Sequence, residues 1–148
     1  MDTIDSMDRF FWSRHANPAS VWTFVAAYPT LVLAIYRRDR PLLAGILLFV
    51  VINPLVSSPP KRDDAWATRV VLGERVWLEQ GILSSKETLF TAACAPVFLY
   101  TIRSASRRDP VRTVGGTVAS MVLMFVFFGR MVSLYETESG LRDAPTSN

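Results

Sequence analysis

The chain has 148 residues with a formal net charge of +3, and half of its residues are hydrophobic, giving a mean hydropathy of +0.24. This length leaves room for one compact unit and no separate soluble domain. One histidine and one cysteine exclude an internal disulfide, a bis-histidine haem and an ordinary structural zinc site, so no cofactor and no metal is expected. The basic residues border apolar stretches, where they suit lipid head groups, and nucleic acid is therefore excluded as a partner.

Four stretches without Asp, Glu, Lys, Arg or His dominate the sequence, with lengths of 21, 20, 15 and 17 residues: 16–36, 41–60, 88–102 and 113–129. A helix needs about 20 apolar residues to cross a hydrocarbon core of roughly 30 Å. Charges are confined to the blocks between these stretches, whereas a soluble bundle shows amphipathic stripes. The pattern predicts an all-α transmembrane domain over residues 1–148, with membrane-crossing helices at about 18–36, 41–58, 82–102 and 113–135.

The segment before the first span predicts a short interfacial helix at about residues 4–14. It places Phe10, Phe11 and Trp12 among charged residues, and aromatic side chains favour the boundary between hydrocarbon and head groups. An Asn-Pro pair at residues 17–18 ends this helix, because a residue that precedes proline leaves helical geometry. The expected interfacial anchors of the whole chain are Phe10, Phe11, Trp12, Trp22, Trp66 and Trp77.

Short connections at residues 37–40 and 103–112 join the spans into two antiparallel hairpins. Both connections carry Arg-Arg-Asp followed closely by proline, a likeness that leaves internal duplication and chance equally open. The two turns hold seven arginines in fourteen residues. Because Lys and Arg concentrate in short cytoplasmic loops, we expect a multi-pass protein of the cell membrane with these turns in the cytoplasm and both termini outside.

Between the hairpins, residues 64–80 predict an amphipathic bridging helix that lies along the membrane surface. Asp64 is its expected N-cap, since a carboxylate at that position accepts a hydrogen bond from a free backbone N–H of the first turn. At about 100° per residue, one narrow stripe of this helix contains Trp66, Val70, Gly73 and Trp77. This stripe is expected to face either the lipid or the bundle.

Five polar residues fall on the same predicted side of the membrane: His15, Asn17, Asp64, Arg69 and Glu74. A histidine beside a carboxylate can act as a general acid or base, and an arginine can hold a phosphate or a carboxylate. Alternatively, these residues tie the N-terminal arm and the bridging helix to the ends of the spans through hydrogen bonds. Both interpretations stay open, and no catalytic residue is assigned.

Five further residues stand out within the spans or at their ends: Asn53, Cys94, Gly115, Gly116 and Arg130. Asn53 is costly against lipid, so we expect it to hydrogen-bond to another helix or to a free carbonyl. Cys94, which lies among alanines, and the adjacent Gly115 and Gly116 favour close helix packing. Arg130 is expected to extend to the membrane surface from the last turn of its span.

Several segments resemble an uncharacterised family of small polytopic membrane proteins, chiefly from halophilic archaea: FWSRHANP at 11–18, VWT at 21–23, NP at 53–54 and DAWATRVVLGE at 64–74. The resemblance covers about residues 10–80. It implies a polytopic membrane fold and no assigned activity. Phe24 and the serines at 57–58 depart from the family pattern, which has more polar and more proline-rich residues there, and the departures leave the expected fold unchanged.

The combined pattern favours a non-catalytic role among membrane lipids. The leading hypothesis is an accessory or scaffold protein that packs as a homo-oligomer or with a larger membrane protein. The alternative is a membrane-surface enzyme or binding protein for a lipid-like ligand, held by the polar residues at 15, 64, 69 and 74. A small oligomeric transporter comes third, because four spans usually need dimerisation to form a pathway and these spans lack paired charges.

Overall fold

The computed structural model describes residues 10–60, 62, 64–81 and 85–143, and this part of the chain is helical without any strand. The prediction of an all-α protein is thereby confirmed. A short helical segment at residues 10–15 precedes five longer helices: α2 (Pro18–Arg37), α3 (Arg40–Val56), α4 (Trp66–Gln80), α5 (Lys86–Ser106) and α6 (Pro110–Asp143). Residues 4–9 of the expected arm and 82–84 of the expected third span lie outside the described residues.

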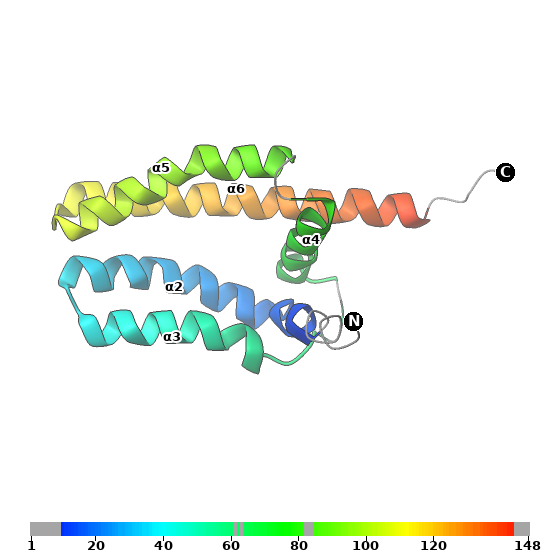
Figure 1. Ribbon diagram of the computed structural model, residues 1–148, viewed down its shortest axis with the longest axis horizontal. Helices are drawn as coiled ribbons and strands as arrows, with labels where there is room; N and C mark the ends of the chain where they lie inside the picture. The colour runs from blue at the N-terminus through cyan, green and yellow to red at the C-terminus, as the bar shows by residue number, and fades with distance from the viewer. Residues whose placement is uncertain (1–9, 61, 63, 82–84, 144–148) are drawn as a thin grey trace.

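The long helices form two antiparallel hairpins, α2 with α3 and α5 with α6, whose turns lie at the same end of the molecule (Figure 1). Both turns have one construction. Arg38 and Arg108 adopt left-handed backbone geometry with φ angles of 57° and 56°. Asp39 and Asp109 then each accept a hydrogen bond of 3.0 Å from a backbone N–H in the first turn of the next helix, as an N-cap does. The Arg-Arg-Asp pattern therefore encodes a repeated turn.

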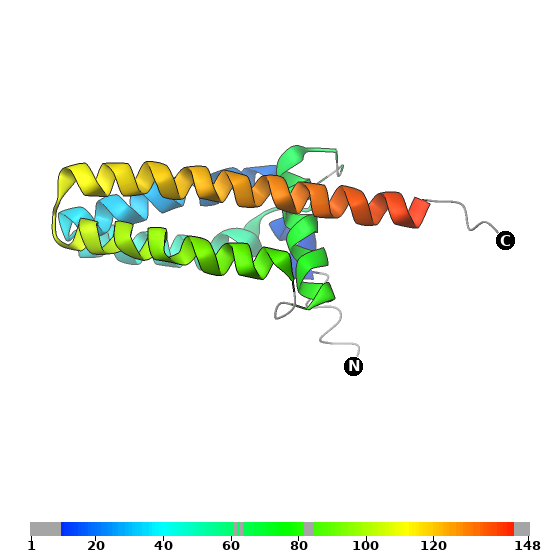
Figure 2. The same ribbon diagram turned by 90° about the horizontal axis from the view of Figure 1, so that it is seen from above.

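Helix α4 crosses the open end of the two hairpins, and α6 continues past it (Figures 1 and 2). Gly73 permits this crossing, because a Cβ at that position would lie 2.0 Å from the carbonyl oxygen of Met131 in α6. On the other side of α4, the Thr68 hydroxyl donates a buried hydrogen bond of 2.8 Å to the Ala16 carbonyl. The helix is thus fixed to both α6 and the N-terminal arm.

The expectation that Asp64 caps α4 is wrong. The helix begins at Trp66, so the N-cap position falls on Ala65, which provides no side-chain hydrogen bond. Asp64 stands one residue too early to accept from the free N–H groups of the first turn, and it is exposed. The predicted end of the helix at about residue 80 agrees with its observed end at Gln80.

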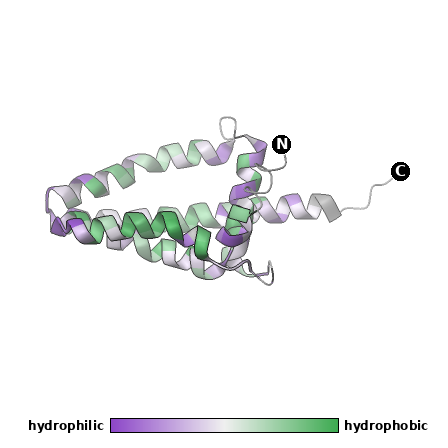
Figure 3. Ribbon diagram, turned by 60° about the horizontal axis from the view of Figure 1, so that its bottom comes forward, coloured by the Kyte–Doolittle hydropathy of each residue, from purple (hydrophilic) through white to green (hydrophobic). Residues whose placement is uncertain are grey.

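The packing places small and polar side chains inside the bundle and large apolar side chains outside. Buried polar residues include Ser20, Thr101 and Ser120, and the last two hydroxyls lie 3.1 Å apart between α5 and α6. The outer surface carries many large hydrophobic residues, among them Leu48, Val51, Leu89, Leu99, Val111 and Val114. Figure 3 shows hydrophobic colouring along the hairpins and hydrophilic colouring at the turns and around α4.

Two of the four predicted spans meet the length and hydropathy that a membrane crossing needs: α2 and the stretch Pro110–Gly140 of α6. Four crossing helices are therefore not shown by the fold alone. Helix α3 holds a shorter apolar stretch, Arg40–Asn53. Helix α5, with 21 residues, is long enough but is not among these candidate spans.

The close approach at Gly73 can be tested by substitution. Gly73→Ala should lower the thermal midpoint markedly or prevent folding, because the added Cβ meets backbone that cannot give way without moving α4. Gly115→Ala is the matched control, since its Cβ meets nothing within 4 Å and alanine is favoured over glycine in a helix by about 0.5–1 kcal/mol. Thermal unfolding followed by tryptophan fluorescence measures both. Equal midpoints for the two variants would contradict the packing described.

Candidate functional site

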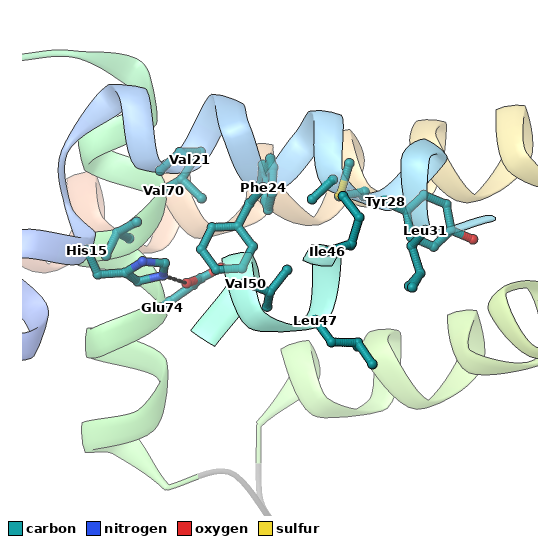
Figure 4. Close-up of a pocket in the computed structure, with 14 residues that line it drawn as sticks. His15, Val21, Phe24, Tyr28, Leu31, Ile46, Leu47, Val50, Val70 and Glu74 are labelled. Atoms are coloured by element: carbon teal, nitrogen blue, oxygen red, sulfur yellow. Dashed lines mark ion pairs between the residues drawn. The ribbon is translucent and has the colours of Figure 1, made fainter. Parts of the chain in front are cut away.

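A cavity of about 440 Å³ lies between α2, α3, α4 and α6, with the helical segment 10–15 at one end (Figure 4). Its wall is almost entirely apolar and includes Val21, Phe24, Leu31, Ile46, Val50 and Phe128. The volume lies within the range of roughly 300–1,000 Å³ that is typical of pockets for small organic ligands. Among the described residues that line it, three carry polar side-chain atoms: His15, Tyr28 and Glu74.

His15 and Glu74 face each other at one end of this cavity, with their Nε2 and Oε2 atoms 3.9 Å apart. Aromatic contacts hold the imidazole in place: it stacks on Phe11 and meets the edge of Phe24, each at a centroid distance of 5.5 Å. Glu74 follows directly after Gly73, so the close packing of α4 on α6 fixes its position. The separation is longer than a direct hydrogen bond, so the two groups do not satisfy each other.

Burial governs the protonation of this pair. It raises the pKa of the Glu74 carboxyl to about 7 and lowers the pKa of the His15 imidazole, because desolvation penalises the charged form of each group. Near neutral pH, His15 is therefore uncharged and Glu74 is divided between its protonated and ionised forms. The pair is a hydrogen-bonding site of low charge and not a fixed ion pair.

Two residues that line the cavity each have a buried polar atom without a hydrogen-bond partner among the described residues: Nδ1 of His15 and the hydroxyl of Tyr28. Buried polar atoms are normally satisfied, and an unsatisfied one costs roughly 1–3 kcal/mol. Within the described part of the chain, no three His, Cys, Asp or Glu side chains gather where they could hold a metal ion. The polar atoms of the cavity therefore suit an organic group that forms hydrogen bonds.

The structure brings together only two of the five polar residues singled out in the sequence. Asn17 caps α2 by accepting from the Ala19 N–H, and its amide donates to the Ser58 carbonyl at 2.7 Å. Arg69 donates to Glu136 of α6 at 2.9 Å. Asp64 is exposed. Asn17 and Arg69 thus tie helices together, whereas His15 and Glu74 line the cavity.

The residues expected to pack or to lie within the spans have varied surroundings. The Asn53 amide donates to the Ser20 hydroxyl at 2.9 Å and so joins α3 to α2, while Cys94 is buried in α5. Gly116 packs against Thr101, but Gly115 faces open space. Arg130 donates to the Glu87 carboxylate at 3.1 Å, with its guanidinium 5.2 Å from the Phe90 ring centroid.

The expected aromatic anchors divide into two groups. Phe10, Phe11, Trp22 and Trp66 are exposed, and the two tryptophans stack with their centroids 5.8 Å apart. Trp12 packs against the buried cluster beside the N-terminal arm. The Trp77 indole N–H donates to the Ser85 hydroxyl at 2.6 Å and so links α4 to the start of α5.

Sequence reasoning did not identify the lining residues of α2. Phe24, Tyr28 and Leu31 are spaced by four and three residues, which places them on one face of a helix. That spacing was the available signal, but in an apolar span it is equally typical of packing against a neighbouring helix. The cavity itself depends on how α3 and α4 are placed, which no local pattern reveals.

The fold and the site define an all-helical protein of two hairpins, closed at one end by a crossing helix and holding an apolar cavity with one acid and one imidazole. The chain belongs to the family of unknown function DUF6653, which matches residues 5–140. This match confirms membership of an uncharacterised family, whose description names neither a membrane location nor a source organism. No curated protein and no solved structure matches the chain.

The raised pKa of Glu74 predicts a pH-dependent stability. The folded protein holds a proton on Glu74 up to about pH 7, whereas an unfolded chain releases it near pH 4.5, so the contribution of Glu74 to the free energy of unfolding should fall as pH rises from about 5 to 8. The loss amounts to at most about 3 kcal/mol. Glu74→Gln should abolish this loss and raise the thermal midpoint at pH 8.

Glu79→Gln is the control for that experiment, because Glu79 lies on the same helix with its side chain 53% exposed. Thermal midpoints of the parent protein and both variants, measured at several pH values in one detergent, supply the comparison. Because the lowered pKa of His15 acts in the opposite direction in the parent protein and in Glu74→Gln alike, the difference between these two midpoints isolates the effect of Glu74. A difference that does not change between pH 5 and 8 would contradict the raised pKa of Glu74.

Proposed function

We propose that the protein is a four-span protein of the cell membrane that binds an amphiphile, with the apolar tail in the cavity and a small polar head at His15 and Glu74. The observation that carries this proposal is the pairing of one acid and one imidazole at the end of an otherwise apolar cavity. The predicted orientation, with both hairpin turns in the cytoplasm, belongs to the same proposal and rests on the density of arginine in the turns.

The distribution of side chains supports a lipid environment. Leu89 and Val111 are 73% and 80% exposed, whereas Thr101 and Ser120 are fully buried. A soluble bundle buries its large apolar residues, and a large exposed apolar patch marks an interaction surface. Helices in membranes associate instead through small and hydroxyl-bearing residues, as these do. Only 17% of the most apolar part of α6 is buried, which is unlike the core helix of a soluble protein.

The lengths of the helices support four crossings. Helices α2 and α5 have 20 and 21 residues and so extend about 30 Å, while α3 with 17 residues extends about 25 Å. All four long helices run side by side between the turns and α4 (Figures 1 and 2). A bilayer that accommodates α2 and α6 therefore also surrounds α3 and α5. Helix α4 would then lie at the membrane surface.

The cavity favours a binding role over the accessory or scaffold role expected from the sequence. The exposed apolar surface does not discriminate between the two, because lipid covers it as well as a protein partner does. The cavity is different, because it places an acid and an imidazole together at one end of a largely apolar space. A scaffold needs neither the space nor the buried acid.

The four-span arrangement predicts which positions a membrane-impermeant maleimide labels. On a Cys94→Ala background, single cysteines at Ser58 and Thr137 should be labelled in intact cells, and those at Arg38 and Ser106 only after lysis. All four parent side chains are exposed, so accessibility within the fold does not bias the result. Labelling of all four positions from one side would overturn the proposal, whereas exchanged sides would overturn only the orientation.

Neighbouring valines on α3 test the binding role. Val50 lines the cavity, whereas Val51 is 65% exposed on the outer surface. Native mass spectrometry of protein extracted gently from its own membrane should show a retained small molecule on the parent protein and on Val51→Phe. Val50→Phe should lose it, because the larger ring occupies the cavity. Thermal unfolding checks that both variants fold.

Two results would contradict the binding role. One is equal retention by the two valine variants. The other is a parent protein that carries no small molecule but copurifies as an oligomer or with a protein partner, which would favour the scaffold role.

A further inference from the structure

We propose that the head group recognised in the cavity is an uncharged hydroxyl, which bridges His15 and Glu74, so that the ligand is a long-chain alcohol. This inference rests on the proposed binding function and names the chemical class of the ligand. It follows from the separation of the two side chains, from the groups that the cavity lacks and from the tautomer that the surroundings of His15 favour.

The separation suits a bridging oxygen. Nε2 of His15 and Oε2 of Glu74 are 3.9 Å apart, which is too far for a direct hydrogen bond. Two hydrogen bonds of about 2.8 Å that meet at one atom span up to about 5.6 Å, so a single oxygen can reach both groups. A hydroxyl both donates and accepts, and it can therefore serve two unlike partners at once.

The surroundings of His15 determine which of its nitrogens donates. Nδ1 is buried and has no partner, so a proton on it would be an unsatisfied buried donor. A buried donor without a partner is rarer than an under-used acceptor. The tautomer with the proton on Nε2 is therefore favoured. Its Nε2–H group lies on the side of the imidazole that faces Glu74. A ligand hydroxyl would accept from Nε2–H and donate to a Glu74 oxygen.

The bridge does not depend on the protonation state of Glu74. An ionised carboxylate accepts through either oxygen, and a protonated carboxyl still accepts through its carbonyl oxygen. The hydroxyl head thus keeps both hydrogen bonds across neutral pH, where Glu74 titrates.

Charged heads fit this end of the cavity less well. An anionic head needs a cation, and none of the described residues that line the cavity is a lysine or an arginine. An ammonium head only donates hydrogen bonds, so it cannot accept one from Nε2–H of His15. Its pairing with Glu74 must also offset the desolvation of two charges in apolar surroundings. The hydroxyl carries no charge and brings one donor and one acceptor, which matches the two groups present.

The remainder of the cavity, which is lined by apolar side chains and Tyr28, suits a chain. Figure 4 shows His15 and Glu74 at one end, with Phe24 and Val50 next and Ile46, Leu31 and Leu47 farther along. A head bound between the two polar groups would thus lead its tail along α2 and α3. Burial of each methylene contributes about 0.8 kcal/mol by transfer from water, so the chain supplies affinity and the hydroxyl supplies orientation.

Three probes with one chain length and different heads test the inference: hexadecanol, hexadecylamine and hexadecanoic acid. Each is added at the same mole fraction to the purified protein in detergent micelles at pH 8, and occupancy is measured by native mass spectrometry. Hexadecanol should be bound about tenfold better than either charged probe, since an opposed donor or an unpaired charge costs at least that factor.

Variants separate hydroxyl recognition from ammonium recognition. Glu74→Leu and His15→Phe should each lower hexadecanol occupancy about three- to tenfold, the effect of one lost hydrogen bond. Glu74→Gln should hold hexadecanol within about threefold, because its amide oxygen still accepts, and Glu79→Gln is the matched control on the same helix. Thermal unfolding of each variant shows that the fold is kept.

The possible results differ in what they overturn. A preference for hexadecylamine that disappears in Glu74→Gln would overturn the hydroxyl inference and leave the binding function standing. A preference for hexadecanoic acid would do the same. If none of the three probes binds, or if Val50→Phe binds hexadecanol as well as Val51→Phe does, the proposed binding function fails as well.

Discussion

The contact between Gly73 and the backbone of Met131 is the constraint on which the arrangement of this protein depends. Because no Cβ stands between them, α4 approaches α6 closely enough to cross the open end of both hairpins. The next residue along α4 is turned by about 100° and so faces α2 and α3 instead of α6. This is how Glu74 comes to lie at the cavity opposite His15. One glycine thereby sets both the crossing of the helices and the geometry of the candidate site.

Helix packing through short side chains also explains why a cavity exists. The bundle interior is held by short polar links such as Asn53 to Ser20 and Thr101 to Ser120, which bring helices together in pairs without filling the space between the pairs. Helix α3 packs mainly against α2. The side chains of α3 and α4 therefore do not fill the space between these two helices. Large apolar residues lie on the outside, where lipid would surround them. The space inside is therefore a consequence of packing by small residues.

Features that depend on local chemistry could be predicted from the sequence. The hairpin turns follow from Arg-Arg-Asp before proline, the break at residues 17–18 from an Asn-Pro pair, and the link from Asn53 from the cost of an unpaired amide. The site could be predicted only in part. Arg69 and Glu74 are separated by five residues, a turn of about 140°, so one pairs with Glu136 while the other lines the cavity. Which of them reached His15 depended on the angle at which α4 crosses, and Gly73 sets that angle through contact with a residue 58 positions away.

The half-buried acid is the feature that packing alone does not explain. An apolar residue at position 74 would extend the apolar stripe of α4 and would avoid the desolvation of a carboxyl group. It would therefore stabilise the fold near neutral pH, where burial raises the pKa of Glu74 to about 7. His15 adds an imidazole whose Nε2 lies 3.9 Å from a Glu74 carboxyl oxygen, too far for a direct hydrogen bond. Local rules of stability are most often broken at functional sites, where the compensating interaction is made with a ligand. A hydroxyl between these two groups would supply that interaction, and the destabilising pair is then the part of the fold that gives the cavity its selectivity.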